Sequence, residues 1–342
     1  MITKANKFLN WIYFLLFFLL SIFIITEPNI GKNAAIKGIL LCGRVIIPSL
    51  FTFSVIILFL MKLLPNLIKG KEKVFIILFS LLGGYPIGAK LLNNCIKEKT
   101  LKEKDAKRML NYCVNAGPAF IIGAVGCGIL SSTKAGYILF FSHIMSSFII
   151  SLLLHKRNEK TTLVATIGKS NFSFTESFTQ SVTDAASMII GICSYVILFS
   201  VLSEYLFHFS KTNPIFRYLG FFLEVTRGVT QTNNIYFISF LLGFSGICIW
   251  CQILSAGKLI KIKLSVFILF RILHGLLSST LTFLLIKIFK ISLPCFSNSV
   301  NYQSVFFYST PIFSISLFCL GIIFIISLFS KKYSGNLLDD ML

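Results

Sequence analysis

Long apolar runs separated by basic loops make up most of this chain. In windows of about 19 residues, apolar segments fall near residues 8–26, 37–63, 74–92, 109–130, 135–154, 181–209, 214–234, 235–256, 265–289 and 305–330. About 20 apolar residues are enough to cross the hydrocarbon core of a bilayer as a helix. The pattern therefore predicts an all-α polytopic membrane protein. The first segment is longer than a signal-peptide core and lacks a small-residue cleavage site, so we expect it to remain as an anchor.

The third segment, 74–92, is interrupted at its centre by Gly83–Pro86. Both a kinked spanning helix and a re-entrant hairpin fit this interruption. If every segment crossed the membrane, the basic loops 62–73 and 93–108 would lie on opposite faces, against the positive-inside rule. A re-entrant hairpin puts both loops on the cytoplasmic side, and we therefore predict a hairpin here.

Segment 214–234 is weakly apolar and carries Glu224 and Arg227, so it is a poor spanning helix and the second predicted hairpin. The resulting topology has about eight transmembrane helices and two re-entrant hairpins, with both termini cytoplasmic. Of the 32 Lys and Arg residues, 21 then lie inside and seven outside. The other four fall within membrane segments: Arg44, Lys90, Arg227 and Arg271.

Two parts of this topology share one order of elements: helix, hairpin, helix, helix. Residues 37–154 begin outside and residues 181–290 begin inside, which makes an inverted repeat. Similar sequences in the two parts align at offsets of 131 and 129 residues, which pairs His143 with His274 and Gly117 with Gly246. The predicted regions are an N-terminal anchor helix (1–36), the first repeat (37–154), a cytoplasmic linker (155–180), the second repeat (181–290) and a C-terminal helix and tail (291–342).

Glycine, proline and polar residues interrupt the apolar segments at four places, two in each repeat. These breaks are Gly83–Gly88, Asn115–Pro118, Glu224–Gly228 and Gly243–Gly246. An isolated glycine commonly serves close helix packing, whereas glycine combined with proline and a polar residue in mid-segment favours a discontinuous helix. Inverted repeats with discontinuous helices indicate a transporter, whose solute contacts freed backbone groups near the bilayer midplane.

Charged residues inside apolar segments are a second functional signal, because each is costly unless it is paired, solvated or functional. Lys90 and Arg271 lie near the inner face, where long side chains can reach the interface. Glu224 and Arg227 are spaced for an ion pair on one helix face. The full set is Arg44, Lys90, Asp184, Glu204, Glu224, Arg227 and Arg271. Four cations against three acids near helix breaks favour an anionic solute, and helix N-termini add to that preference.

The composition argues against several other classes of protein. Hydrophobic residues make up 56% of the chain, the mean hydropathy is +0.85, and the net charge of +20 comes from loops, so no basic face is available for nucleic acid. The nine cysteines lie mostly in apolar segments and are interpreted as small core residues, including the C-x-x-C pair Cys248 and Cys251. Because no catalytic or phosphate-binding motif is recognisable, we expect no enzyme activity, no metal and no cofactor.

Five motifs, taken together, resemble the sporulation integral membrane protein YlbJ (SpoVV) family of the nucleoside-recognition (Gate) domain group. They are PSLFTF (48–53), GGYPIGAKL (83–91), NAGPAFIIGAVG (115–126), LEVTRG (223–228) and GFSGICIWCQ (243–252). The resemblance covers nearly all of 37–290. The chain departs from it around Ile247 and Trp250, where members usually carry a second Gly and a His, and at Arg227, where an Asn is frequent.

The resemblance implies a plan similar to that of concentrative nucleoside transporters, with two Gate-like repeats whose hairpins and unwound helices form the site. It also implies endospore formation and transport of dipicolinic acid, a small aromatic dianion, across the outer forespore membrane. By resemblance, the solute-binding residues are Gly84, Tyr85, Pro86, Lys90, Asn115, Gly117, Pro118, Glu224, Thr226, Arg227, Ser245, Gly246 and Gln252.

The resemblance also implies roles for these residues. We expect Asn115, Ser245 and Gln252 to hydrogen-bond the solute, Lys90 or Arg227 to balance its charge, and Tyr85 or Phe244 to stack on its ring. Expected partners are a small anionic solute and the lipid bilayer, but no nucleic acid, and a homo-oligomer is left open.

Two other interpretations stay open. One is a nucleoside or other small-metabolite transporter. The other is a non-transporting membrane scaffold needed for spore cortex formation, which would recruit its partners through the basic loops 93–108 and 155–180.

Overall fold

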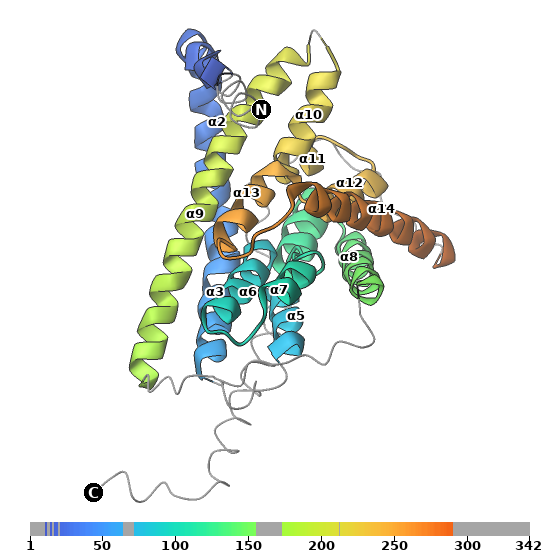
Figure 1. The fold of residues 1–342 in the computed structure, drawn as a ribbon. Coiled ribbons are helices and arrows are strands. Elements are labelled where there is room, and N and C mark those ends of the chain that lie inside the picture. Colours follow the sequence, from blue (N-terminus) through green and yellow to red (C-terminus); the bar gives the residue numbers. More distant parts are fainter. Residues whose placement is uncertain are drawn as a thin grey trace, which may run out of the picture. The chain divides into compact units, whose positions relative to one another are not determined.

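The computed structural model describes residues 21–63, 72–154, 173–211 and 213–289, together with positions 11, 14, 15 and 17–19. The regular elements among these residues are all helical (Figure 1). The predicted C-terminal helix, most of the predicted linker and part of the predicted anchor helix lie outside the described residues.

Two long helical stretches pack side by side (Figure 1). The first consists of α2 (Pro28–Leu41), the π-helical segment η1 (Cys42–Ile46) and α3 (Ile47–Leu63), and it bends by 52°. The second is α9 (Phe174–Phe209), a helix of 36 residues that contacts both α2 and α3.

Both stretches begin earlier than the sequence predicts. Helix α2 begins with Pro28 in its first turn, where proline is favoured because its missing N–H is not needed, instead of at residue 37. Helix α9 begins at Phe174 instead of 181, because Ser173 and Glu176 form a capping box. The first turns of both helices contain polar residues. An apolar segment defined by mean hydropathy over about 19 residues therefore begins after these turns.

The first predicted hairpin is present as α5 (Glu72–Gly83) and α6 (Tyr85–Lys97), which meet at Gly84. Gly84 has a φ of 87°, a conformation that favours glycine. A Cβ atom built on Gly88 would lie 2.9 Å from the Cβ of Ser80. In a straight helix, residues eight apart are separated by about 12 Å along the axis. The chain therefore folds back on itself at Gly84.

The second predicted hairpin consists of α10 (Ile215–Leu223) and α11 (Val225–Thr230), with Glu224 at its tip. A Cβ atom built on Gly228 would lie 3.2 Å from the carbonyl oxygen of Phe221. Seven residues along a straight helix would separate these positions by about 10 Å, so this segment also folds back.

The other two predicted breaks are present as well. After α7 (Glu103–Leu110), residues 111–117 form no helix, and the π-helical segment η2 (Ala119–Ile129) follows. Helices α12 (Ile235–Phe244) and α13 (Gly246–Ala256) are separated by Ser245, and both Ser245 and Gly246 have positive φ angles. Each of the four breaks predicted from Gly, Pro and polar residues thus contains a real interruption of a helix.

Helices α8 (Thr133–Leu153) and α14 (Leu264–Ile288) pack against each other. Helix α8 also packs on η2, and α14 packs on α12. The rings of His143 and His274 meet at the contact between α8 and α14, with centroids 4.4 Å apart. The two histidines that the sequence offset pairs are therefore neighbours in space.

Four of these stretches are long and apolar enough to cross a membrane: Thr133–Leu153, Phe174–Phe209, Ile235–Ala256 and Leu264–Ile288. The bent pair formed by α2 and α3 is a fifth candidate. Of the other three predicted spans, 8–26 is only partly described and 305–330 lies outside the described residues. The third, 109–130, contains the non-helical stretch 111–117, which includes the predicted break at Asn115–Pro118, and the 11-residue η2, so it is not among the continuous candidate spans.

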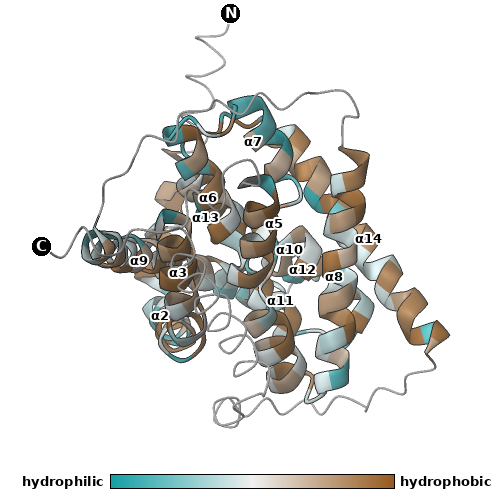
Figure 2. Cartoon of the chain, turned by 90° about the horizontal axis from the view of Figure 1, so that it is seen from below, coloured by the Kyte–Doolittle hydropathy of each residue, from teal (hydrophilic) through white to brown (hydrophobic). Residues whose placement is uncertain are grey.

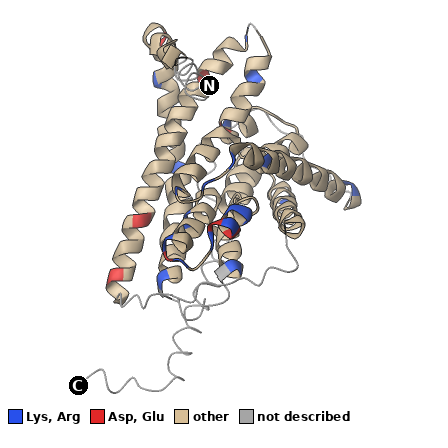
Figure 3. Ribbon diagram, in the orientation of Figure 1, with Lys and Arg blue, Asp and Glu red and all other residues tan. Residues whose placement is uncertain are grey.

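The outward faces of these helices are apolar (Figure 2), with exposed residues such as Phe141, Leu152, Ile190, Leu269 and Leu276. Large apolar surfaces of this kind are expected where helices face lipid instead of water. Charged residues gather instead around α7 and the end of α6 (Figure 3). The described part of the chain is thus a multi-pass helical membrane protein.

Candidate functional site

A cavity of about 70 Å³ lies where the tips of the two hairpins approach each other. We call it the tip cavity. The first hairpin contributes Gly84, Tyr85 and Pro86, and the second contributes Glu224, Val225 and Thr226. Gly117 from the non-helical stretch and Gln252 from α13 complete its polar side, while α9 and the α2–η1–α3 stretch supply mostly apolar walls.

Each hairpin tip rests on the helix break that follows it in the sequence. A Cβ atom built on Gly117 would lie 3.3 Å from the backbone nitrogen of Gly84. In the second half, a Cβ atom built on Gly246 would lie 3.2 Å from the carbonyl oxygen of Phe222 and 3.4 Å from the nitrogen of Val225. At each of the two contacts, backbone atoms of the hairpin tip therefore approach backbone atoms of the helix break. Gly84 and Gly117 form the first contact, and Gly246 supplies the glycine of the second.

Two aromatic side chains bind carbonyl groups close to the break between α12 and α13. The hydroxyl group of Tyr85 donates a 2.6 Å hydrogen bond to the carbonyl oxygen of Leu242, which connects the first hairpin tip to the second half of the chain. The indole N–H of Trp250 donates a 2.9 Å bond to the carbonyl oxygen of Phe244. Residue Trp250, a departure from the family pattern, thus binds a carbonyl group at the break.

The non-helical stretch 111–117 is held by buried side chains from α8 and α14. The guanidinium of Arg271 donates to the carbonyl oxygens of Val114, at 2.8 Å, and of Asn111. The ring nitrogen Nε2 of His143 accepts a 3.0 Å bond from the N–H of Ala116. These bonds satisfy backbone groups that a continuous helix would have paired internally.

The carboxylate of Glu224 caps the helix that follows it. It accepts hydrogen bonds from the backbone N–H groups of Thr226, at 3.0 Å, and Arg227, at 2.7 Å. Only 3% of Glu224 is exposed, and the residue lines the tip cavity. The tip of the second hairpin therefore places an acidic group beside any solute in the cavity.

The spacing of Glu224 and Arg227 suggests an ion pair, and the structure shows the Glu224 carboxylate bound to the backbone N–H of Arg227. The guanidinium of Arg227 instead pairs with Glu204 of α9, to which Lys37 also lies 3.7 Å away. The sequence separation of three residues suggested a pair on one helix, but Glu224 precedes α11 and turns its carboxylate onto that helix's N–H groups. The guanidinium of Arg227 therefore faces α9 and is not part of the lining of the tip cavity.

Arg271 is also placed differently from its prediction. It is fully buried, so its guanidinium does not reach the membrane interface. Sequence reasoning missed its contribution to the non-helical stretch, and that of His143. The available signal was the position of both residues within long apolar segments, where a polar group needs a partner.

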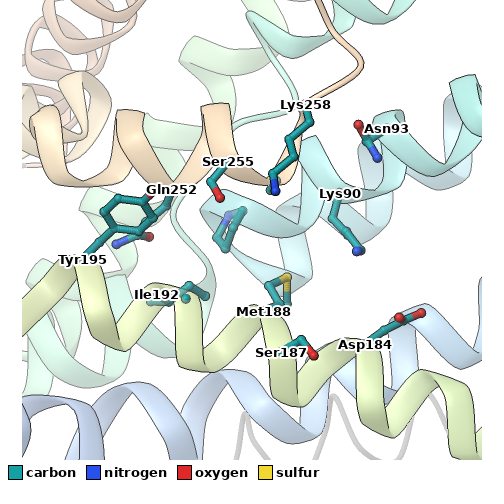
Figure 4. Close-up of a pocket in the computed structure, with 13 residues that line it drawn as sticks. Lys90, Asn93, Asp184, Ser187, Met188, Ile192, Tyr195, Gln252, Ser255 and Lys258 are labelled. Carbon is teal, nitrogen blue, oxygen red and sulfur yellow. The ribbon is translucent and has the colours of Figure 1, made fainter.

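A second, more polar cavity of about 240 Å³ adjoins the tip cavity (Figure 4). We call it the vestibule. It is lined by one face each of α6, α9 and α13, and it shares Pro86, Ile192 and Gln252 with the tip cavity. Lys90, predicted to bind the solute at the hairpin, lines the vestibule instead. Asp184, at the same cavity, pairs with Lys62 of α3 at 2.9 Å.

The structure brings seven of the thirteen predicted site residues into the tip cavity: Gly84, Tyr85, Pro86, Gly117, Glu224, Thr226 and Gln252. Asn115 and Pro118 flank Gly117 in the chain, and Ser245 and Gly246 form the break behind the second tip. The amide of Asn115 donates to the carbonyl of Tyr112, while its buried Oδ1 atom has no partner among the described residues. Phe244 packs on Trp250 and Phe222.

Metal-binding groups do not gather in the described part of the chain. No three His, Cys, Asp or Glu side chains converge there. The thiols of Cys248 and Cys251 are free, and Cys248 accepts a weak hydrogen bond from Gln252. What the tip cavity can offer a ligand is hydrogen-bonding backbone, two amide side chains nearby and the Glu224 carboxylate.

This fold and site define a multi-pass helical membrane protein in which two helical hairpins and two interrupted helices surround one cavity. No family model and no solved structure matches the chain. The chain is similar to the sporulation integral membrane protein YlbJ of Bacillus subtilis (strain 168), with 23% identity over an alignment that covers 84% of each protein.

Proposed function

We propose that this protein is a sporulation membrane transporter that moves a small anionic solute, with dipicolinic acid preferred, across the outer forespore membrane. The observation that carries the proposal is that both hairpin tips and the break at Gly117 line the tip cavity, while the break at Gly246 contacts the second tip. Broken helices at such a place present backbone donors and acceptors to a solute near the bilayer midplane. The sporulation role follows from the description of the Bacillus subtilis relative.

The preference for an anion is supported by the buried charge of Arg271. Among the described residues no carboxylate pairs with its guanidinium, whose partners are backbone carbonyl groups of the stretch 111–117. A positive charge in a medium of low dielectric acts strongly on its surroundings. The same stretch reaches the tip cavity at Gly117, so an anion there would be attracted.

We further propose an inverted repeat of two Gate-like units, with about eight transmembrane helices, re-entrant hairpins and cytoplasmic termini. The proposal draws support from the matching order of long helix, hairpin, interrupted helix and final helix in the two halves. The contact between His143 and His274 fits an axis that relates the halves. In this arrangement the hairpins close opposite ends of the site and open alternately.

The volume of the tip cavity fits a closed state. At about 70 Å³ it is smaller than the roughly 300–1,000 Å³ of typical ligand pockets. A solute the size of an aromatic dicarboxylate therefore requires the tips to move apart. Gly84 and Gly117 contact each other through backbone atoms, because neither has a side chain. Moving the two segments apart at this point therefore breaks few side-chain contacts.

A nucleoside is the second candidate solute, because Glu224 lines the cavity. A carboxylate repels a dianion but accepts hydrogen bonds from sugar hydroxyl groups. For either solute we propose transport without chemical change and without a cofactor, so the solute recovered after transport should be intact.

Uptake of labelled dipicolinate by purified protein in liposomes, with nucleosides as competitors, tests the proposal. We expect saturable dipicolinate flux that falls in Asn115→Ala and is unchanged in a matched loop variant, Lys99→Gln. Absence of saturable flux in folded protein would overturn dipicolinate as the solute. Strong competition by nucleosides would favour the second candidate, and a spore defect caused by loop variants alone would favour a scaffold.

A further inference from the structure

The vestibule contains two lysines from distant parts of the chain. Lys90 comes from α6, and Lys258 comes directly after α13; Figure 4 shows both side chains at the same cavity. Neither forms an ion pair with another described residue, whereas Asp184 at the same cavity is paired with Lys62. Two like charges at one cavity repel each other, and an anion bound between them would offset that repulsion.

The loop that carries Lys258 forms hydrogen bonds with α6 and α7. The backbone N–H of Leu259 donates a 2.9 Å hydrogen bond to Oδ1 of Asn93, one turn beyond Lys90 on α6. The N–H of Lys261 lies 3.4 Å from the carboxylate of Glu103 on α7. A hydrogen bond from Lys107 lowers the pKa of Glu103 and keeps it ionised. The backbone next to Lys258 is therefore positioned by contacts with α6 and α7, and Lys258 lines the same cavity as Lys90.

Exposure falls along the vestibule from its mouth to its inner end. Lys258, Ser255 and Ser187 are exposed, while Gln252 and Ile192 are buried and also line the tip cavity. The lining residues of α9 run from Asp184 to Tyr195, a length of about 16 Å. The vestibule thus leads inward from two lysines to the candidate solute site.

We propose that the vestibule is a separate capture site for small dianions with carboxylate or phosphate groups, which Lys90 and Lys258 bind before the anion passes to the tip cavity. Serine hydroxyls and the Asn93 amide supply further donors. As a step of transport this site depends on the proposed function, but anion binding at the two lysines can be measured without transport. A soluble dianion and an anionic lipid headgroup share this chemistry.

Protection of lysines from reductive methylation, read by peptide mass mapping, tests binding directly. The probes are dipicolinate, succinate and inorganic phosphate, added to protein in nanodiscs of neutral lipid. We expect Lys90 and Lys258 to be protected and Lys263, an exposed lysine that does not line the vestibule, to react as before. Equal reactivity of all three lysines with every probe would overturn the capture site. Protection by anionic lipid alone, without a soluble probe, would assign the site to a headgroup.

Dipicolinate flux in liposomes tests whether the anion passes from the vestibule to the tip cavity. We expect Lys90→Gln and Lys258→Gln each to raise KM severalfold with little change in maximal flux, and Lys263→Gln to leave both unchanged. An unchanged KM in the first two variants would overturn the role in transport. If no variant and no wild-type protein carries dipicolinate, but the lysines are still protected, the proposed function fails while the anion site stands.

Gly191 offers a way to block the vestibule. It lines the cavity on α9, and a Cβ atom built on it would meet nothing within 4 Å. Gly191→Leu should therefore fill open space without strain and reduce maximal flux severalfold. Gly123→Leu on η2, where a Cβ atom also meets open space, is the matched control and should transport normally. Normal flux in folded Gly191→Leu would show that the vestibule is not the path.

Discussion

The buried guanidinium of Arg271 donates a 2.8 Å hydrogen bond to the carbonyl oxygen of Val114, 157 positions earlier in the chain. The bond joins α14 of the second half to the non-helical stretch of the first half. An interrupted helix in a membrane exposes carbonyl groups that lipid cannot satisfy, so a buried donor must reach them. The break at 111–117 thus depends on a residue that lies in the other half of the molecule.

Replacing Arg271 should destabilise this stretch. Arg271→Met leaves the carbonyl oxygens of Asn111 and Val114 without their donor, at a cost of about 1–3 kcal/mol for each buried group. Arg271→Lys keeps the charge and one donor, so it should lose less. Thermal unfolding in detergent measures the difference. Equal melting temperatures for Arg271→Met and wild type would contradict the assigned role.

Gly88 lies where α6 touches the non-helical stretch. A Cβ atom built on it would lie 1.9 Å from the carbonyl oxygen of Cys113, a backbone atom that cannot move without disturbing its neighbours. We expect Gly88→Ala to destabilise the protein by about 1–3 kcal/mol or more.

The control for Gly88 is Gly123→Ala, because a Cβ atom on Gly123 meets open space. That variant should melt within a degree or two of wild type. A similar loss in both variants would mean that the contact with Cys113 does not explain the effect, because alanine has a higher helix propensity than glycine at either position.

Arg227 and Glu204 form a cross-helix pair that a double-mutant cycle can measure. Arg227→Gln and Glu204→Gln should each destabilise the protein, and the double variant should lose less than their sum, with a coupling of about 0.5–3 kcal/mol. The pair connects α11 at the second hairpin to α9. Additive losses would show that the two residues act independently.

The same variants separate a structural role for Arg227 from the predicted binding role. If Arg227 bound the solute, Arg227→Gln would raise KM while Glu204→Gln would not. We expect the two variants to change KM alike, because each breaks the same contact outside the tip cavity.

The fold could be predicted from sequence wherever local chemistry decides it. Gly83–Pro86 and the polar interruption at Glu224 mark both hairpin tips, and the basic loops on either side of the first favour a hairpin over a kinked helix. Helix starts were placed too late at α2 and α9 because capping depends on polar residues that apolar windows pass over. Side-chain partners were harder to predict. Arg227 and Arg271 bind groups that are distant in the sequence, so no local pattern could reveal them.

For the candidate site, too, the residues that interrupt helices could be predicted from local sequence, whereas the direction of side chains could not. Residues that interrupt helices, such as Gly84, Gly117 and Glu224, line the tip cavity because interruptions are where hairpin tips and breaks meet. Lys90 was assigned to this cavity because it lies one turn from the hairpin tip. It lines the vestibule instead, since its side chain leaves α6 toward α9 and α13. That direction depends on packing, which the sequence alone does not contain.

Glu224→Gln distinguishes the two candidate solutes by the sign of its effect. The amide keeps one oxygen as an acceptor for the N–H groups of Thr226 and Arg227, so the loss of stability should be modest, about 0.5–2 kcal/mol as for other helix caps. For a dianion, removing a negative charge from the cavity wall should strengthen binding and lower KM.

For a nucleoside, the same substitution replaces a charged acceptor by a weaker neutral one and should raise KM. The measurement is flux against concentration in liposomes, for dipicolinate and for a nucleoside in parallel. Glu224→Leu serves as the second variant, because it removes the cap as well as the charge. Only that variant should show a large loss of thermal stability. A higher KM for dipicolinate in folded Glu224→Gln would argue against an anion in contact with this wall, since removal of a repelling charge cannot weaken such a contact.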